Sequence, residues 1–220
     1  CHPKIDMISC STICNGNEKP SIKLHFPYPT GKHCDDGCDW SKMNLHTTEI
    51  IESNSNSALL KRTIDLTTYY VLVQWESSAS LDKKGNNYFV LKSNNNKLKF
   101  SCHFSSTKPS QHSLKFDVTK RDASKNWNNF WNNGGIVDFS RCKDSRAKEL
   151  ERRVVLSQYL LAIQCSGSTP PQETGLTYNS WFGKFHLEMI WWHQVQFALW
   201  GRAHLLERTL PWYDKVAPIA

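Results

Sequence analysis

The sequence predicts a multidomain protein of the β-then-α class, with an antiparallel β-sandwich followed by a helical domain of the solenoid or toroid type. Short β-rich segments separated by Asn, Ser, Gly and Asp clusters fill residues 21–118, which is typical of a sandwich. Helix-forming segments joined by loops of unequal length follow residue 145. The chain has 220 residues, of which 39% are hydrophobic, so it can bury a sizeable core.

Residues 1–120 are predicted to form the sandwich, in incomplete form. Alternating or β-branched segments predict strands at 21–26, 69–75, 88–91, 98–100 and 114–118. Clusters of Pro, Gly, Asp and Asn predict turns at 27–31, 82–85 and 94–96. No helix longer than a turn or two is expected in this part of the chain.

Residues 121–144 are predicted to be a linker, because 127–135 is polar and aromatic and ends in Gly134 and Gly135, which suit a hinge. Residues 145–220 are predicted to begin the helical domain. Its first helix spans 146–164 with Asp144 or Ser145 as N-cap, and its apolar second half is expected to be buried. A second helix is expected at 187–200, and a third from about 203.

Composition argues against several partners. The net charge is +7, but charged residues make up 21% of the chain and no basic block exceeds three residues, so nucleic acid is not expected. No segment approaches the roughly 18 apolar residues of a membrane span, and no signal segment opens the chain. Aromatic residues make up 12%, which suits stacking on the apolar faces of sugar rings.

The eight cysteines include two pairs with C-x3-C spacing, Cys10 with Cys14 and Cys34 with Cys38. This spacing falls within the range seen for structural zinc. Unrelated or disulfide-bonded cysteines are the favoured interpretation, so neither a metal nor a cofactor is expected.

Three aspartates near His33 raise a similar question. Asp35, Asp36 and Asp39 could suggest a divalent cation. An Asp- and Gly-rich turn is the favoured interpretation, because these residues are common in turns.

The candidate functional site is the long loop at 166–186 together with the helix start that follows it. Long loops in compact domains are usually functional or disordered, and the aromatic residues here argue against disorder. The patch offers a carboxylate, an ammonium, two imidazoles and two indoles, a mixture suited to carbohydrate. The alternative is a buried helix with core tryptophans, in which Glu188 forms an ordinary salt bridge with Lys184.

Two segments resemble a known family. Residues 138–153, DFSRCKDSRAKELERR, and residues 171–193, PQETGLTYNSWFGKFHLEMIWWH, resemble large secreted bacterial glycosidases of the Bacteroides type. In layout these are similar to maltose phosphorylase and α-fucosidase-like enzymes, with an N-terminal β-sandwich, a helical linker and an (α/α)6 barrel. The resemblance covers about residues 21–213 and is specific across 181–188.

The resemblance implies a glycoside hydrolase that acts on an oligo- or polysaccharide in the periplasm or outside the cell, with this chain as an interior fragment. It implies that Glu188 holds ring hydroxyls. The residues that it places along the sugar-binding subsite are Trp181, Lys184, His186, Glu188, Trp192 and His193. The acid and base of such enzymes lie on later helices, so the isolated fragment is expected to be inactive.

Two alternatives accompany this expectation. Glu173 and Glu188 are the carboxylates of the candidate region, and hydrolysis needs two carboxyl groups across the scissile bond, so they could form a catalytic pair. The chain could also be a non-catalytic carbohydrate-binding or structural module, in which the aromatic loop binds sugar without cleaving it.

Overall fold

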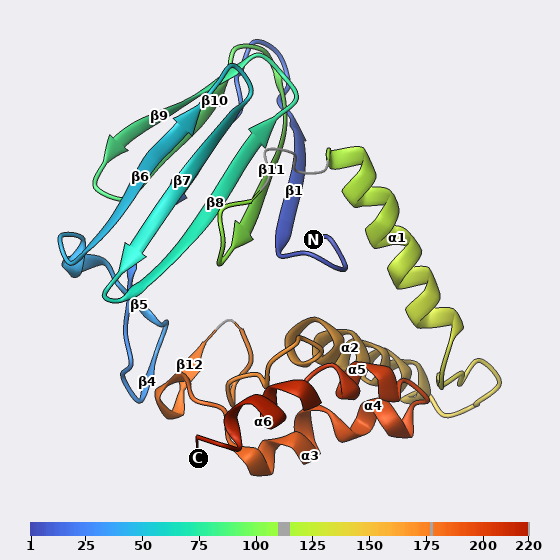
Figure 1. Ribbon diagram of the computed structural model, residues 1–220. Helices are drawn as coiled ribbons and strands as arrows, with labels where there is room; N and C mark the ends of the chain where they lie inside the picture. The colour runs from blue at the N-terminus through green and yellow to red at the C-terminus, as the bar shows by residue number, and fades with distance from the viewer. Residues whose placement is uncertain (110–114, 177, 220) are drawn as a thin grey trace. The chain divides into compact units, whose positions relative to one another are not determined.

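The computed structural model describes residues 1–109, 115–176 and 178–219, and these residues form two compact units (Figure 1). The first unit comprises Cys1–Pro29 and Cys38–Asn128, and the second comprises Thr30–Gly37 and Asn129–Ala220. Antiparallel sheets come first in the chain and helices follow, which confirms the predicted β-then-α order. The predicted sandwich and toroid stay predictions.

Two larger antiparallel sheets build most of the first unit. The five-stranded sheet has the order β1 (Met7–Ile13), β11 (Lys97–Ser105), β8 (Thr67–Trp75), β7 (Ser57–Ile64) and β6 (His46–Ser53). The three-stranded sheet has the order β2 (Ser21–His25), β10 (Tyr88–Ser93) and β9 (Ala79–Gly85). The short strands β3 (Tyr28–Pro29) and β5 (Cys38–Asp39) pair with each other, and the 3-10 helix η1 (Trp40–Lys42) follows.

Residues from both sheets share one apolar core. In β8, Val71, Val73 and Trp75 alternate with residues that face away, because side chains along a strand point to opposite faces. Phe89 and Leu91 of β10, in the other sheet, belong to the same buried cluster. The strands predicted at 21–26, 69–75, 88–91 and 98–100 lie within or overlap β2, β8, β10 and β11, so these predictions are confirmed.

Two local predictions in this unit are wrong. The turn predicted at 82–85 is the end of β9, and the chain reverses just after it, where Asn87 adopts a left-handed φ of 56° that Asn tolerates better than most residues. The strand predicted at 114–118 is also wrong, since Phe116 begins the helix α1 (Phe116–Asn132) and Leu114 lies outside the described residues.

The helix α1 also replaces the connector predicted at 127–135. Its first turn carries Asp117, whose negative charge the helix dipole favours. No Gly or Pro interrupts the chain from Phe116 up to Gly134. Gly134 has a φ of 105°, which ends the helix and suits glycine alone. The predicted linker at 121–144 is therefore helical through Asn132.

The helix α2 (Ala147–Cys165) confirms the helix predicted at 146–164. Arg146 occupies the N-cap instead of the predicted Asp144 or Ser145, and Asp144 Oδ1 accepts a hydrogen bond from the Arg146 N–H at 2.8 Å. The prediction that the second half of this helix is buried is partly wrong. Cys165 is buried, but the outward face that includes Leu160 and Ile163 is exposed.

The single helix predicted at 187–200 is wrong, because the segment forms three short pieces. These are η3 (Leu187–Met189), α3 (Ile190–His193) and α4 (Val195–Leu199). The break falls at Gln194, whose buried side chain donates to the Cys165 carbonyl at 2.9 Å. The helices α5 (Ala203–Glu207) and α6 (Leu210–Val216) follow, near the predicted start at 203.

Polar groups contribute much of the interior of the second unit. Arg202 is 2% exposed, and its guanidinium donates to the carbonyls of Phe130 and Gly135 and to Gln158 Oε1 at 3.0–3.2 Å. Its charge also lies 4.2 Å from the centre of the Phe130 ring. None of the helices in the described residues is long and apolar enough to cross a membrane.

Candidate functional site

The candidate loop at 166–186 pairs with a segment from far earlier in the chain. We call Thr30–Gly37 the inserted segment, because it belongs to the second unit although its neighbours belong to the first. Its strand β4 (Cys34–Asp35) pairs antiparallel with β12 (Asn179–Ser180) of the loop. Asn179 Nδ2 also donates to the Lys32 carbonyl at 2.8 Å, so the loop is fixed at its middle.

The most unusual backbone of this unit lies directly after β12. Trp181, Phe182 and Gly183 form the 3-10 helix η2 (Trp181–Gly183) with left-handed φ values of 48°, 63° and 67°. We call this segment the aromatic turn. Left-handed non-glycine residues cost of order 1–3 kcal/mol each and gather at functional sites, so two in succession need support from their surroundings.

His33 of the inserted segment supplies part of that support. Its ring lies 4.8 Å from the Trp181 ring and 5.2 Å from the Phe182 ring, edge-on to both. The Phe182 N–H donates to the His33 carbonyl at 3.3 Å. Trp181 and Phe182 nevertheless stay 48% and 50% exposed, so the turn presents aromatic surface to solvent.

Four of the predicted site residues come together beside this turn. His186 Nε2 lies 3.5 Å from Glu173 Oε2, an ion pair when the imidazole is protonated, yet this nitrogen is buried without a hydrogen bond. The Trp181 ring lies 6.0 Å from the His186 ring. His193 is buried, and its Nε2 lies 3.0 Å from the Glu173 carbonyl oxygen, so it ties its helix to the loop.

The other predicted residues lie in different surroundings. Lys184 Nζ lies 5.8 Å from the centre of the Phe182 ring. Trp192 is 67% exposed on α3, and Glu188 is exposed on η3. Within the described residues, Glu188 forms no ion pair with Lys184, so the salt bridge of the structural alternative is absent. The pairing of Glu173 with Glu188 stays a prediction.

A pocket of about 410 Å³ lies on the loop and the inserted segment. Its volume falls within the roughly 300–1,000 Å³ typical of small-molecule sites. We call it the loop pocket. The lining residues are Thr30, Asp36, Gly37, Gln172, Leu176, Tyr178, Asn179, Phe182 and Gly183.

Sequence reasoning missed the polar residues of this pocket, although it noted the turn that contains Asp36. Asp35 keeps that turn in shape. Hydrogen bonds from Thr30 Oγ1 at 2.5 Å and from the Gly37 N–H at 2.7 Å hold the pKa of Asp35 below its usual value. The turn that sequence analysis favoured over a cation site is therefore present, and it forms one wall of the pocket.

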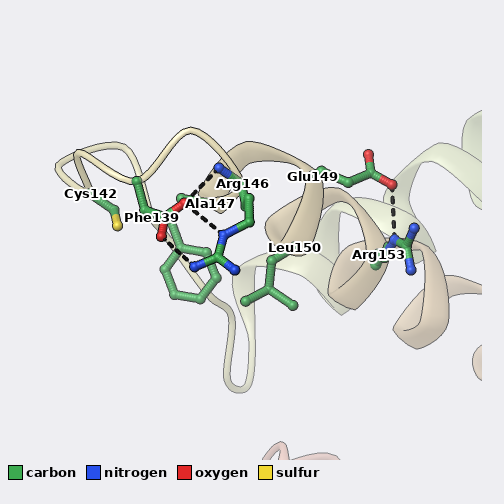
Figure 2. Close-up of a pocket in the computed structure, with 8 residues that line it drawn as sticks. Phe139, Cys142, Arg146, Ala147, Glu149, Leu150 and Arg153 are labelled. Carbon is green, nitrogen blue, oxygen red and sulfur yellow. Dashed lines mark hydrogen bonds and ion pairs between the residues drawn. The ribbon is translucent and has the colours of Figure 1, made fainter.

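A second pocket, of about 650 Å³, lies at the start of α2 (Figure 2). Its apolar surface comes from Phe139, Ala147 and Leu150 with Cys142 beside them, as Figure 2 shows. Its charged lining groups are paired within the pocket, since Asp144 bonds Arg146 and Glu149 bonds Arg153. No charge is left over in this lining to recognise an ion.

Within residues 1–109, 115–176 and 178–219, no group of three or more His, Cys, Asp or Glu side chains is placed so that it could hold a metal ion. Among the described residues, no disulfide joins Cys10 to Cys14 or Cys34 to Cys38. Comparison with protein-family models, curated proteins and solved structures gives no match to this chain.

Proposed function

We propose that the chain is part of a glycoside hydrolase and that its second unit supplies a sugar-binding surface. The observation that supports this is the aromatic turn. Trp181 and Phe182 both have strained, left-handed backbone there, and both side chains are half exposed. Strained backbone persists where surroundings enforce it, and it is common at binding sites. The motif across 181–188, which resembles that of large bacterial glycosidases, favours the same function.

In this proposal the exposed Trp181 face packs against the C–H face of a sugar ring, and polar groups beside it bind the hydroxyls. Glu173 and His186 form such a pair, with the His186 ring 6.0 Å from the Trp181 ring, and Lys184 lies over Phe182. The complete enzyme in this proposal has a β-sandwich and an (α/α)6 toroid, acts on an oligo- or polysaccharide, and works in the periplasm or outside the cell.

One observation favours a second candidate, a carbohydrate-binding module without catalysis. Hydrolysis needs two carboxyl groups placed across the bond. The Glu173 carboxylate is paired with His186, whereas Glu188 is an exposed residue of η3 that forms no ion pair with another described residue.

The test uses the whole chain and a panel of neutral oligosaccharides in calorimetric titrations. We expect Trp181→Ala to weaken binding about tenfold or more, because loss of an aromatic contact of about 1.5 kcal/mol corresponds to a factor of ten. Trp191→Ala is the matched control, since Trp191 is exposed on α3 outside the aromatic turn. Equal affinities for Trp181→Ala and the unmodified chain would contradict the proposal.

Hydrolysis of aryl glycosides separates the two candidates. We expect the 220-residue chain to bind sugar without turnover. Measurable turnover that Glu173→Gln or Glu188→Gln abolishes would instead assign these two carboxylates as the catalytic pair.

A further inference from the structure

The inner face of the five-stranded sheet is apolar over most of its length and polar at one end. Along β7, the side chains of Ala58, Leu60 and Arg62 point to this face in turn, and Thr48 of β6 lies opposite Arg62. Arg62 is 3% exposed, and His46 at the start of β6 is 4% exposed. Two basic side chains are therefore buried beside the apolar core, where charged groups are rarely found without a partner.

Neutral groups surround the buried guanidinium of Arg62. It donates to the Pro27 carbonyl and lies 3.5 Å from Thr48 Oγ1, and its charge lies 5.0 Å from the centre of the Phe26 ring and 5.9 Å from that of Tyr69. The Arg62 Nε is buried without a hydrogen bond. Among the described residues, no carboxylate forms an ion pair with Arg62, so its positive charge is not compensated there.

Asn87 determines which protonation state of His46 fits the fold. Asn87 Nδ2 donates to the Met43 carbonyl at 2.9 Å and to the His46 carbonyl at 3.1 Å, and carbonyls can only accept, so the amide nitrogen must lie on this side. The same nitrogen lies 3.5 Å from His46 Nε2, whereas His46 Nδ1 is buried without a hydrogen bond. A neutral imidazole with its hydrogen on Nδ1 fits this arrangement. An imidazolium would point a second N–H at a nitrogen that is itself a donor.

The other titratable groups around His46 do not compensate a positive charge on it. The Tyr28 ring lies 5.7 Å from the His46 ring, and the Tyr28 hydroxyl donates to Asp65 at 3.0 Å. Lys42 Nζ lies 5.8 Å from the centre of the Tyr28 ring, and His25 is a second imidazole in the neighbourhood. Asp65 is the acid in this set, and it forms no ion pair with His46.

Burial and neighbouring positive charge both favour the neutral form of His46. Burial is the largest cause, followed by Arg62 and then His25, and each lowers the pKa of His46 from its ordinary value of 6.5. In the opened chain, His46 takes up a proton below about pH 6.5. Because the folded form resists this proton, its stabilisation is complete above about pH 6.5 and is lost as the pH falls below that value.

The same three residues join the two larger sheets of the first unit. Asn87 lies in the turn between β9 and β10 of the three-stranded sheet, and it bonds the start of β6 in the five-stranded sheet. The Asn87 carbonyl accepts a hydrogen bond from the Phe26 N–H at 3.0 Å, just after β2. Arg62 of β7 bonds the next residue, Pro27. Pro27 and Met43 precede and follow the inserted segment in the chain, so these contacts fix the chain on both sides of it.

We propose that His46, Arg62 and Asn87 form an acid-sensitive latch in the first unit. The latch holds the two larger sheets together at this end while His46 is neutral, and protonation of His46 opens it. An imidazolium would bring a second positive charge beside Arg62 and a donor against the Asn87 nitrogen, so the opened form takes up the proton. The proposal is independent of the proposed function, because all three residues belong to the first unit.

The test measures amide hydrogen exchange of the whole chain at pH 7.5 and pH 5.5, with protection factors corrected for the intrinsic exchange rate. We expect protection at Phe26 and at the start of β6 to fall by up to about tenfold at the lower pH, the limit for one histidine of ordinary pKa. His46→Gln should lose this dependence on pH, since glutamine does not titrate. His204→Gln is the control, because His204 is exposed on α5 and should leave the dependence unchanged.

A second variant should remove the dependence by supplying an acceptor. Asn87→Asp places a carboxylate where the amide nitrogen faces His46 Nε2, and aspartate tolerates the left-handed φ of 56° at this position. We expect protection in this variant to be no lower at pH 5.5 than at pH 7.5, because the imidazolium then has an anionic partner.

An NMR titration of the His46 imidazole in the unmodified chain decides the matter if either variant misfolds. We expect His46 to be half protonated below pH 6.5. Half-protonation at or above pH 6.5 would overturn the proposal. An equal fall in protection in the unmodified chain and in His46→Gln would overturn it as well, whatever the sugar titrations of Trp181→Ala show.

Discussion

The two units of the chain are stabilised in different ways. In the first, the central cluster has ten buried apolar residues among those described, including Leu60, Val73 and Phe89, and they come from both larger sheets. In the second, the buried apolar cluster has three residues within the described part, Cys165, Phe197 and Leu205. Around them lie buried polar side chains such as Arg202 and Gln194, which bond to backbone carbonyls.

This difference in the interior determines how strictly the backbone of each unit is fixed. Apolar packing depends on volume and tolerates many exchanges of similar size. A buried polar group needs its partners at fixed positions, since an unmade hydrogen bond is costly in the interior. Gln194 illustrates this, because its bonds to the Cys165 carbonyl and to Thr209 coincide with the break between α3 and α4. The buried polar groups of the second unit thereby accompany an irregular backbone.

The largest effect is expected from a cavity in the apolar cluster. Phe89→Ala should lower the free energy of unfolding by about 3–5 kcal/mol, because Phe89 is fully buried at the centre of the first unit. Urea denaturation gives the magnitude, and hydrogen exchange should show lost protection in β10 and its neighbours. Leu66→Ala is the control, since Leu66 is fully exposed and its removal should change stability by less than about 0.5 kcal/mol. If Phe89→Ala lowered the free energy of unfolding by less than about 1 kcal/mol, apolar packing would not be the main source of stability in the first unit.

The next effect tests the polar interior. Arg202→Met should destabilise the second unit by about 3 kcal/mol, because it leaves the carbonyls of Phe130 and Gly135 and the Gln158 side chain without their donor. Hydrogen exchange of α2 and α5 measures this loss, and Arg141→Met on the exposed surface is the control. Equal or higher stability of Arg202→Met would mean that packing, and not the hydrogen-bond network, stabilises this unit.

The smallest effect concerns pH at the exposed start of α2. Hydrogen bonds from Arg152, and then from Arg153, lower the pKa of Glu149 from 4.5 to about 2. A carboxylate with a lowered folded-state pKa stabilises the fold above the unfolded value, and this contribution is lost as pH falls from about 4.5 towards 2. Circular dichroism should therefore show a loss of helix in that range that is smaller in Glu149→Gln. If the unmodified chain and Glu149→Gln lost the same amount of helix in acid, other carboxylates would be the cause.

Regular segments with strong local patterns could be predicted from the sequence. The strand around Val71 and Val73 and the helix around Leu150 and Leu160 follow from residue type and spacing. The segment at 114–118 misled because Phe116 and Val118 alternate like a strand, whereas the residues after them continue as a helix. The break at Gln194 depends on a tertiary hydrogen bond to Cys165, which no local pattern reveals.

The candidate site was predictable only where its residues lie close together in the sequence. Trp181, His186 and Glu173 lie near one another in the sequence, and the structure brings them together with His193. The part that sequence reasoning missed comes from the inserted segment, since Asn179 and Asp35 are 144 residues apart in the chain. Only the fold brings His33 and Asp36 to the loop.

The inserted segment also sets an order of events during synthesis. Thr30–Gly37 emerges early, but its partner strand β12 follows it by the 144 residues that separate Asp35 from Asn179. At about 5–20 residues per second, the segment waits roughly 7–30 s on the ribosome before β12 exists. During that time Cys34 and His33 have no partner strand to cover them, whereas the strands of the first unit can already pair. The loop at 166–186 therefore reaches its final form later than the strands of the first unit.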